Sequence, residues 1–309
     1  MTVSPLVSIA LCTYNGEKFL VKQLDSLLSQ DYENIEIIIV DDCSKDNTFI
    51  ILKDYQQKEN RIKLYRNERN LGYTKNFEKA LTLCTGKYIA FADQDDIWET
   101  DKISLCTEAI KGHIMVYHNS DFIDTSDKTM GDGTVASRLR VYEGDSCLPF
   151  LIANCVHGHA VLFDSTLKKY LLPFNEKFSH DWWLAYVAFN IGAVKYLDKI
   201  LVHYRQHTSS VTDTFQLRTR KSSETKPVKG IERMSVNLDM LKHCAEFKYN
   251  KDAALIEEAY HSLSNLAKGK AKLKAFWFLV KHFELLFYIR NQIKSNFSKV
   301  NYVRKVCFN

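Results

Sequence analysis

The chain has 309 residues, enough for one large domain with an appendage or for two small domains. Hydrophobic residues make up 46% and charged residues 26%, with only 4 Pro and 11 Gly, which excludes a low-complexity chain. The start has no signal-peptide pattern, no apolar run reaches the ~18 residues of a membrane span, and the 8 Cys include no C-x-x-C pair, so we expect a cytosolic protein with reduced thiols.

Charge is distributed unevenly along the chain. The net charge is +5, but residues 268–309 contain ten Lys or Arg and one acid, so this segment carries +9 and residues 1–267 sum to −4. A basic segment that follows an acidic body indicates an anionic partner for that segment.

Short β-rich runs alternate with helical patterns over the first 125 residues. The predicted strands are residues 7–12, 35–40, 61–65, 88–92 and 114–118, and the predicted helices are residues 18–29, 47–57, 75–84 and 99–112. This alternation predicts an α/β fold with a mostly parallel central sheet flanked by helices. In such sheets ligands bind beyond the carboxyl ends of the strands. Polar clusters follow four of these strands, at residues 13–15, 41–42, 67–70 and 93–96.

The rest of the chain predicts fewer strands and more helices. Residues 125–145 hold few apolar residues and predict a surface loop. We then expect helices at residues 147–153 and 165–171, a strand at 160–163, a helix that begins near Ser179 or His180, and strands at 194–197 and 200–204. A polar stretch predicts a flexible loop or linker at residues 213–230, and residues 231–309 predict a basic, aromatic helical region.

Three carboxylates follow the strand predicted at residues 88–92, in the run Asp93-Gln94-Asp95-Asp96. Asp is rare in strands, and in a D-x-D run the first and third side chains point the same way, so they can converge on one cation. Oxygen ligands favour Mg²⁺ or Mn²⁺, which suit a diphosphate. The alternative is a polar turn in which the Asp side chains bond their own backbone.

Four ordered motifs need one explanation. They are residues 7–16 (VSIALCTYNG), residues 38–46 (IIVDDCSKD), residues 70–72 (NLG) leading into 93–98 (DQDDIW), and residues 181–183 (DWW) with the later 204–207 (YRQH). In this order and at these separations they resemble the large inverting glycosyltransferase group called family 2, which has the GT-A fold. The resemblance covers roughly residues 5–212, and its motif style looks most like bacterial enzymes that build rhamnose-containing or other surface polysaccharides.

The resemblance implies a GT-A catalytic domain at residues 1–212, in which residues 1–125 bind a UDP- or dTDP-sugar. Asp42 would accept the imide N–H of uracil or thymine. The same donor pocket would be lined by Thr13, Asn15 and Gly72. For Asp41 and Asp42 the alternative is a helix-capping turn, with Ser44 or Asp46 as the cap.

The resemblance also implies a divalent metal, Mn²⁺ or Mg²⁺. Asp95 would ligate the metal directly, and Asp93 would hold the ribose or the metal's shell. His207 would complete the metal site, with His203 as the alternative, and Arg205 would contact the diphosphate. The metal would stabilise charge as the nucleoside diphosphate leaves.

Residues 126–212 would form the acceptor side, with Asp181 as the general base. Inversion by a single displacement needs a carboxylate opposite the leaving group, and the first turn of a helix keeps that carboxylate ionised. The alternative is an Asp placed there only for the helix dipole, and many relatives carry an acid where this chain has His180. Trp182 and Trp183 point about 100° apart on a helix, so one is expected to pack and the other to contact the acceptor sugar.

The C-terminal region combines aromatic runs at residues 275–280 and 283–289 with flanking lysines. A basic, aromatic helix fits an anionic bilayer, where a lipid-linked acceptor would reside, so we expect a protein peripheral on the inner face of the cell membrane. The alternative is a helical pair that packs on the catalytic domain or on a second subunit in a homodimer. We expect part of the region to pack on protein and part to contact lipid. Nucleic acid is not an expected partner, because the sheet carries no basic stripe.

The sequence therefore predicts an inverting, metal-dependent glycosyltransferase that extends a lipid-linked saccharide. One alternative is a sugar-phosphate nucleotidyltransferase, which needs a Gly-rich, basic loop after its first strand, whereas residues 13–17 read TYNGE. A second alternative is a non-catalytic nucleotide- or carbohydrate-binding protein. In the sequence, only Asp181 distinguishes an enzyme from such a protein.

Overall fold

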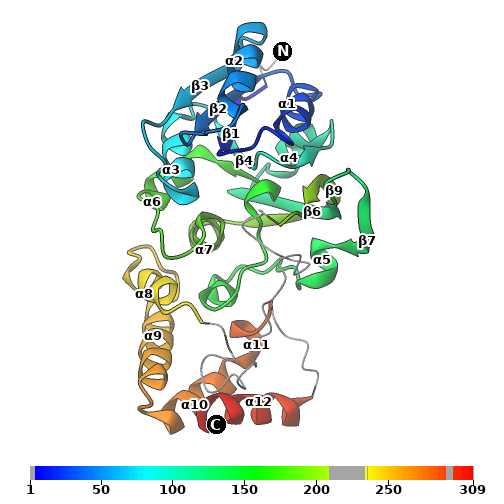
Figure 1. The fold of residues 1–309 in the computed structure, drawn as a ribbon. Helices are drawn as coiled ribbons and strands as arrows, with labels where there is room; N and C mark the ends of the chain where they lie inside the picture. The colour runs from blue at the N-terminus through cyan, green and yellow to red at the C-terminus, as the bar shows by residue number, and fades with distance from the viewer. Residues whose placement is uncertain (1–3, 209–233, 235, 290–294, 309) are drawn as a thin grey trace.

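The computed structural model describes residues 4–208, 234, 236–289 and 295–308, and Figure 1 shows an α/β fold with the N-terminal strands at one end and the C-terminal helices at the other. The strands are β1 (Val7–Thr13), β2 (Ile35–Asp41), β3 (Ile62–Arg66), β4 (Tyr88–Ala92), β5 (Ile97–Trp98), β6 (Met115–Ile123), β7 (Thr129–Thr134), β8 (Val161–Asp164) and β9 (Val194–Arg205). They form one sheet in the order β3-β2-β1-β4-β8-β6-β9-β5, with β7 paired to β6.

The helices fall into two groups. Those of the sheet-bearing part are α1 (Leu20–Leu28), α2 (Thr48–Lys58), α3 (Tyr73–Leu83), α4 (Lys102–Ala109), α5 (Val135–Arg138), α6 (Lys168–Leu171) and α7 (His180–Ile191). Short 3₁₀ helices add η1 (Leu148–Leu151), η2 (Gly158–Ala160) and η3 (Ser165–Leu167). The C-terminal group is α8 (Leu238–Glu246), α9 (Ala253–Ala267), α10 (Lys272–Lys281), α11 (Phe283–Leu286) and α12 (Asn296–Phe308).

The first half of the sheet is parallel and buried on both faces. β1 pairs in parallel with β2 and β4, and β2 pairs in parallel with β3. Side chains alternate between two cores, so Ile9 and Leu11 of β1 pack with α1 and α4, whereas Ala10 and Cys12 pack with α3 and α7. The carboxyl ends of β1, β2 and β4 consequently reach one edge of the sheet, where the sequence places its polar clusters.

The second half of the sheet mixes directions. β8 is antiparallel to β4 and β6, while β9 runs parallel to β6. The two predicted strands at residues 194–197 and 200–204 are one strand, β9, whose register against β6 shifts beside Asn119. The prediction missed β5, which has only two residues and is held by its pairing with β9.

The predicted surface loop at residues 125–145 is wrong for residues 129–138, which form β7 and α5. β7 lies antiparallel to β6 at the sheet edge, so its backbone is paired although its side chains are polar. α5 begins with a capping box in which Thr134 and Ser137 exchange hydrogen bonds. The helix predicted at residues 147–153 is the shorter 3₁₀ turn η1, whose second residue is proline.

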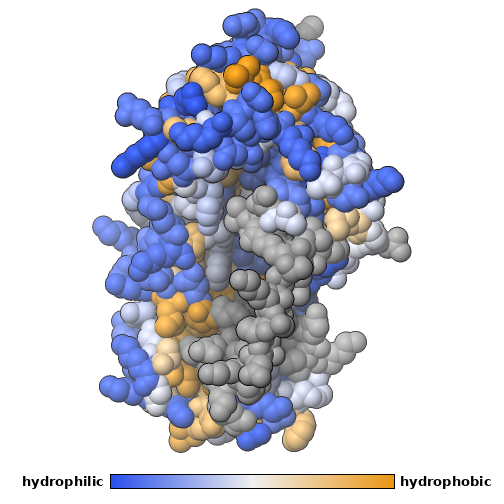
Figure 2. Space-filling model, viewed as in Figure 1, coloured by the Kyte–Doolittle hydropathy of each residue, from blue (hydrophilic) through white to orange (hydrophobic). Residues whose placement is uncertain are grey.

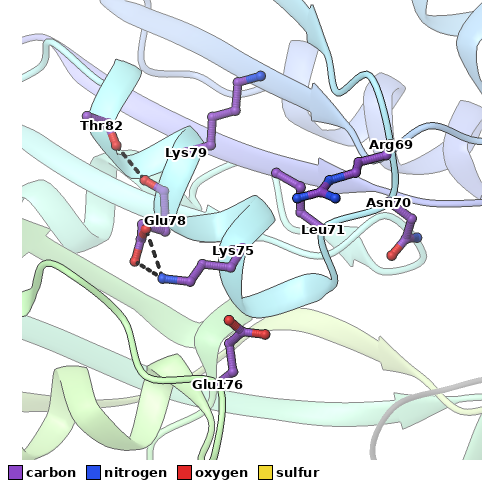
Figure 3. Close-up of a pocket in the computed structure, with 8 residues that line it drawn as sticks. All are labelled: Arg69, Asn70, Leu71, Lys75, Glu78, Lys79, Thr82 and Glu176. Atoms are coloured by element: carbon purple, nitrogen blue, oxygen red, sulfur yellow. Dashed lines mark hydrogen bonds and ion pairs between the residues drawn. The ribbon is translucent and has the colours of Figure 1, made fainter.

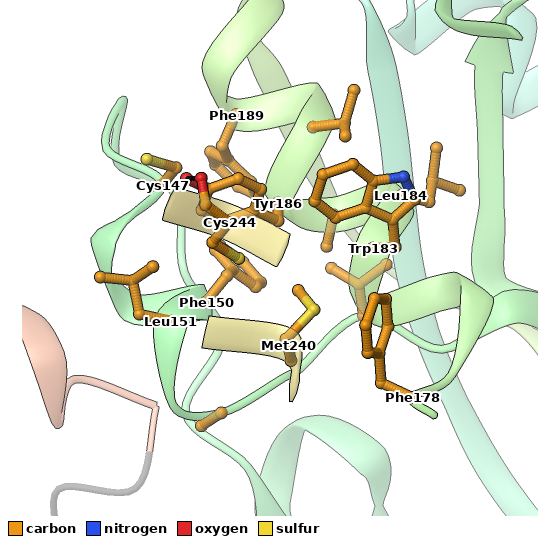
Figure 4. Packing of buried hydrophobic residues seen from close by; sticks show 14 of the residues in the cluster. Cys147, Phe150, Leu151, Phe178, Trp183, Leu184, Tyr186, Phe189, Met240 and Cys244 are labelled. Atoms are coloured by element: carbon orange, nitrogen blue, oxygen red, sulfur yellow. Dashed lines mark hydrogen bonds between the residues drawn. The ribbon is translucent and has the colours of Figure 1, made fainter. Parts of the chain in front are cut away.

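The C-terminal helices pack on the sheet-bearing part through a shared core. Met240 and Cys244 of α8 meet Phe150 and Trp183, as Figure 4 shows, and α9, α10 and α12 extend the same cluster. The linker predicted at residues 213–230 lies outside the described residues. No described helix has both the length and the apolar character that a membrane span requires. All eight cysteines lie in the described part, unpaired, and seven are buried.

Candidate active site

The ends of β1 and β2 are tied together by buried polar contacts. Thr13 lies opposite Asp41 in the register, and its hydroxyl donates to the Asp41 carboxylate at 3.3 Å. Asp41 is fully buried, accepts from the Ser44 N–H at 3.1 Å and pairs with Arg66 at 3.2 Å. Thr13 and Asp41 therefore hold the loop in shape, and the side chain of Thr13 is buried beneath the expected donor pocket.

Asp42 presents a fixed carboxylate at the end of β2. One oxygen accepts from the Asn67 side chain at 2.7 Å and the Leu71 N–H at 2.8 Å, and the other accepts from the Gly72 N–H at 2.9 Å. Gly72 precedes α3 with φ 83°, a left-handed conformation that a side chain would strain. Because a carboxylate has about four lone-pair sites, Asp42 keeps one for a ligand.

A separate cavity of about 590 Å³ lies behind this loop, beside α3 (Figure 3). Arg69, Asn70 and Leu71 line one side of it and Glu78, Lys79 and Glu176 are among the residues of the other side. Its Lys79 donates to Asn67 at 2.8 Å, and Asn67 in turn donates to Asp42. Lys79, on the wall of this cavity, therefore supports the Asp42 loop through Asn67. The acidic run at residues 93–96 does not line the cavity.

Asn15 and Gln94 join the loops after β1, β2 and β4. Asn15 accepts from the Lys45 N–H at 2.8 Å, and its own N–H donates to Ser44 at 2.9 Å. Gln94 exchanges two hydrogen bonds with the backbone of Tyr14, at 2.8 and 3.0 Å. A Cβ on Gly16 would lie 2.3 Å from the Gln94 side-chain oxygen, so a larger residue there would require the Gln94 side chain to move.

Asp95 and His207 meet although they are far apart in the sequence. The His207 Nε2 lies 2.8 Å from an Asp95 carboxylate oxygen. The antiparallel pairing of Ile97 in β5 with His203 in β9 brings the two segments together. His203, the alternative ligand, is instead bound by Asp121 at 2.7 Å and Glu99 at 2.9 Å.

Arg205 is fully buried and its contacts are with protein. Its Nε donates to the Asp95 carbonyl at 2.6 Å, its backbone N–H donates to Asp96 at 3.0 Å, and its guanidinium pairs with Asp127 at 2.6 Å. The Arg205 Nε thus fixes the backbone of Asp95, and its Nη2 has no hydrogen-bond partner among the described residues, so the expected contact with a diphosphate stays a prediction.

Asp93, Asp96 and His159 form a second group of potential ligands, whose atoms lie within 4.8 Å of one another. Asp96 is fully buried, and one of its oxygens has no hydrogen-bond partner among the described residues. His159 lies 3.8 Å from that carboxylate and 4.0 Å from Asp93. The expected set of Asp93, Asp95 and His207 is thus divided, with Asp95 beside His207 and Asp93 beside Asp96.

Crowding of like charges changes the acidity of this group. The Asp93 side chain is 41% exposed, and loss of surrounding water, then the charges of Asp95 and Asp181, raise the pKa of Asp93 above its usual value. Burial, then the charges of Asp95 and Asp93, raise the pKa of Asp96 well above its usual value. A divalent cation would bind carboxylates that repel one another, the unpartnered Asp96 oxygen and the imidazoles of His159 and His207. The residues present therefore fit a Mg²⁺ or Mn²⁺ ion.

Asp181 lies in the first turn of α7, which begins after the cap residue Ser179. Its carboxylate accepts from the Trp182 N–H at 2.6 Å and from the Gly158 N–H at 3.2 Å. Gly158, which donates to Asp181, is followed by His159, whose ring lies 4.0 Å from Asp93. The sequence motifs after β4 and before α7 therefore meet in space.

The two tryptophans after Asp181 have different surroundings. Trp183 is buried, stacks on Tyr186 and donates to the Leu171 carbonyl at 3.2 Å, so it belongs to the core and not to an acceptor site. Trp182 is half-buried and donates to the Phe150 carbonyl at 2.6 Å. Of the two, only Trp182 keeps surface for an acceptor.

Residues 157–159 (His-Gly-His) were missed from the sequence. Gly158 holds Asp181 through its N–H, and the carbonyl of His159 accepts from the buried Lys102 at 2.6 Å. The Lys102 ammonium also lies 3.1 Å from the centre of the Trp98 ring, and burial lowers the pKa of Lys102 to about 7. Two histidines around a glycine, directly before a β-rich run, were the available signal.

Comparison with known proteins places the chain in a family. The model described as Glycosyl transferase family 2 matches residues 8–171, more than half of the chain. The chain belongs to glycosyl transferase family 2. The chain is 30% identical over 258 residues to the UDP-Glc:alpha-D-GlcNAc-diphosphoundecaprenol beta-1,3-glucosyltransferase WfaP of Escherichia coli, covering 80% of this chain and 99% of that protein. It is also 26% identical over 271 residues to an uncharacterized glycosyltransferase of Haemophilus influenzae, covering 83% of this chain and 81% of that protein.

Solved structures share the fold. TarS 1–349 of S. aureus in complex with UDP-GlcNAc matches with a TM-score of 0.59 at 18% identity, over 92% of this chain and 82% of that one. The mannosyltransferase PcManGT of Pyrobaculum calidifontis, in complex with GDP-Man and Mn2+, matches with a TM-score of 0.58 at 18% identity, over 91% and 76%. The expected GT-A fold and the assignment as a glycosyltransferase of the hexosyltransferase class are confirmed.

Proposed function

We propose that this family 2 enzyme inverts the anomeric centre while it moves one sugar from a UDP- or dTDP-sugar to a hydroxyl of an undecaprenyl-diphosphate-linked saccharide, during synthesis of a bacterial O-antigen or capsule. Support for the acceptor class comes from WfaP, whose name gives a GlcNAc-diphosphoundecaprenol acceptor and whose length this chain covers almost completely. The reaction would take place at the cytoplasmic face of the cell membrane.

One observation carries the proposal: the segment 157–159 links the candidate base Asp181 to the acidic run that contains the Asp95–His207 pair. Asp95 and His207 are 2.8 Å apart, the Gly158 N–H donates to Asp181 at 3.2 Å, and the His159 ring lies 4.0 Å from Asp93. A displacement at the anomeric carbon needs a stabilised leaving group and a base for the incoming hydroxyl. Asp95, His207 and Asp181 are of the residue types that these two tasks require.

On the donor side we assign recognition of the nucleobase to Asp42, whose remaining lone pair would accept the imide N–H of a pyrimidine. Asn15 and the Gly72 backbone would form the walls of this pocket. Thr13 and Arg205 would support this pocket, because their side chains donate to Asp41 and to the Asp95 carbonyl. This arrangement favours UDP- or dTDP-sugars over purine nucleotides.

Asp95 and His207 would hold the divalent ion, with Asp93 nearby for its shell or for the ribose. When bound, the ion would neutralise charge on the leaving diphosphate. Asp181 would take the proton of the acceptor hydroxyl. The N–H groups of Gly158 and Trp182 aim its carboxylate. The exposed part of Trp182 would contact the acceptor sugar.

Two other functions remain as alternatives. A sugar-phosphate nucleotidyltransferase is disfavoured because the loop at residues 13–17 has one glycine and an acid in place of a phosphate-binding run, and because the chain belongs to a glycosyltransferase family. A binding protein without catalysis would keep the nucleotide pocket and the metal ligands, and only the activity of Asp181 distinguishes the two.

Two measurements together test the proposal. UDP- and dTDP-sugars are screened with Mn²⁺ for thermal stabilisation, since a donor at 100 times its Kd adds about 2.7 kcal/mol. The stabilising donor is then offered with a polyprenyl-diphosphate saccharide, and the anomeric configuration of the product is determined. A transferred sugar with inverted configuration is expected, whereas donor binding without transfer or hydrolysis would favour the binding protein.

A further inference from the structure

The outer face of the two C-terminal helices α10 and α12 exposes large apolar side chains. Leu273 and Trp277 of α10 are 64% and 63% exposed, and Phe297 of α12 is 83% exposed. Phe308, at the end of α12, is also exposed. We call these four residues and the surface between them the α10–α12 surface. Figure 2 shows hydrophobic residues among hydrophilic ones at this end of the molecule.

The helices turn these side chains outward because their other faces are already packed. Phe278 and Leu279 of α10 and Val303 and Val306 of α12 are buried in the shared core. Leu273 and Trp277 are four residues apart, so they lie on one face of α10. Phe297 and Phe308 are eleven residues apart, about three turns, so they lie on one face of α12.

Ring contacts connect the two helices across this surface. The Phe276 ring lies 5.3 Å from the Trp277 ring and 5.8 Å from the Phe308 ring, between centroids. Aromatic contacts therefore join Trp277 on α10 to Phe308 on α12, so these exposed apolar side chains form one group and are not scattered singly.

The charge around the surface is almost entirely positive. Among the described residues of 268–308 the cations are Lys268, Lys270, Lys272, Lys274, Lys281, Lys299, Arg304 and Lys305. The one acid of this segment, Glu284, is neutralised by an ion pair with Lys299. A phosphate-bearing surface is complementary to this arrangement, and apolar side chains among the cations favour acyl chains over a nucleic-acid backbone.

A second copy of this chain fits less well. A two-fold symmetric contact places the same patch on both subunits, so the lysines of each α10 would face those of the other. That juxtaposition is repulsive, whereas anionic lipid attracts every one of these cations.

We propose that the α10–α12 surface docks on an anionic lipid bilayer, with Trp277 and Phe297 at the boundary between head groups and acyl chains and the lysines against the lipid phosphates. The inference deepens the proposed function, on which it rests for its purpose, because a lipid-linked acceptor lies in the same bilayer. The docking helices share a core with α7, so binding would hold Asp181 at a fixed height above the membrane.

Tryptophan fluorescence of the full chain tests the surface directly. Of the four tryptophans, Trp98 and Trp183 are buried and Trp182 is half-buried, so Trp277 is the exposed one. Vesicles of phosphatidylcholine with phosphatidylglycerol should shift the emission to the blue, and vesicles of phosphatidylcholine alone should shift it much less. Salt should weaken the binding, because the Debye length falls to ~3 Å at 1 M.

Variants identify the residues that bind. Trp277→Ala should weaken partitioning by roughly tenfold or more. Lys272→Gln and Lys274→Gln should each weaken it about fivefold, since each cation near the surface contributes ~1 kcal/mol. The matched controls are Ile50→Ala, at a residue 61% exposed on α2 at the other end of the molecule, and Lys58→Gln on the same helix. Neither control should change partitioning.

Three results would overturn the inference: vesicles that leave the protein free, binding that Trp277→Ala does not weaken, or a concentration-dependent dimer that buries Trp277 in the absence of lipid. Binding to DNA with the same blue shift would assign the surface to nucleic acid instead. None of these readouts requires turnover. A protein that binds vesicles and transfers no sugar would refute the proposed function and leave the docking surface intact.

Discussion

Replacement of Asp181 by Asn separates a catalytic carboxylate from a structural one. The carboxylate accepts from the Trp182 N–H at 2.6 Å and from the Gly158 N–H at 3.2 Å. The amide oxygen of Asn can keep the shorter bond, but its NH₂ group then faces the Gly158 N–H and one bond is lost. A net hydrogen bond contributes about 0.5–1.5 kcal/mol and the charge at the helix N-terminus about 0.3–1 kcal/mol. We expect the free energy of unfolding to fall by about 1–2 kcal/mol.

The effect on the rate should be much larger than this loss of stability. Asn has no lone pair basic enough to take the acceptor's proton, and loss of a positioned base costs about 10²–10⁴-fold. The Kd for nucleotide-sugar with Mn²⁺ should change little, since the donor contacts assigned above lie on other loops. Initial rates of transfer, donor titration and chemical denaturation measure the three quantities on one preparation.

A matched control exists in α8. Asp239 also lies in the first turn of its helix, where it pairs with Lys177 at 2.7 Å. Asp239→Asn should lose a similar helix-dipole contribution and keep the wild-type rate. Near wild-type turnover by Asp181→Asn would refute the assignment and make His180 or Asp96 the next candidate. A variant that does not fold would show that Asp181 is a structural cap.

Three further predictions follow from contacts in the sheet and around the acidic run at residues 93–96. Burial alone would raise the pKa of Glu36, but hydrogen bonds lower it to about 2. Glu36→Gln should therefore lower the free energy of unfolding, measured by chemical denaturation at pH 7, by about 2 kcal/mol. This value includes a discount because the lysine partner is half-exposed. That difference is fully present above about pH 4.5 and should disappear as the pH falls toward 2; a difference that stays constant over this range would contradict it. Asp95→Ala and His207→Ala should each abolish Mn²⁺-dependent donor stabilisation with little change in the Tm of the free protein, and normal transfer by Asp95→Ala in EDTA would exclude the metal assignment. Gly16→Ala should lower donor affinity and stability because its Cβ would displace the Gln94 side chain, and an unchanged Kd would show that the loop adapts.

The parallel half of the fold could be predicted because its signals are local. β1, β2 and β4 are buried on both faces, so each is a short continuous apolar run, and a helical pattern follows each one. β5 and β7 carry no such signal. β5 has two residues and β7 is polar, and both exist only because a neighbouring strand pairs with them.

The same distinction applies to the site. Asp95 and His207 are 112 positions apart, and their meeting could be expected only from the resemblance to a family. The physical cause is the pairing of β5 with β9, which the sequence does not show. Arg205 illustrates the opposite case: its position beside His207 suggested a ligand contact, whereas the structure shows it buried and bonded to three protein acceptors, and the ligand contact stays a prediction.

The loop at residues 157–159 explains why the two halves of the site keep a fixed separation. At Gly158 its backbone holds Asp181, and at His159 its carbonyl accepts from the buried Lys102 while the ring lies 3.8 Å from Asp96. One short segment is therefore bonded to the candidate base and lies beside the acidic loop. A displacement reaction needs the attacking and leaving groups on one line, and a change of about 1 Å in that geometry can cost 10²-fold in rate. The spacing between Asp181 and the acidic loop thus depends on the Gly158 backbone, which the His-Gly-His run alone could not indicate.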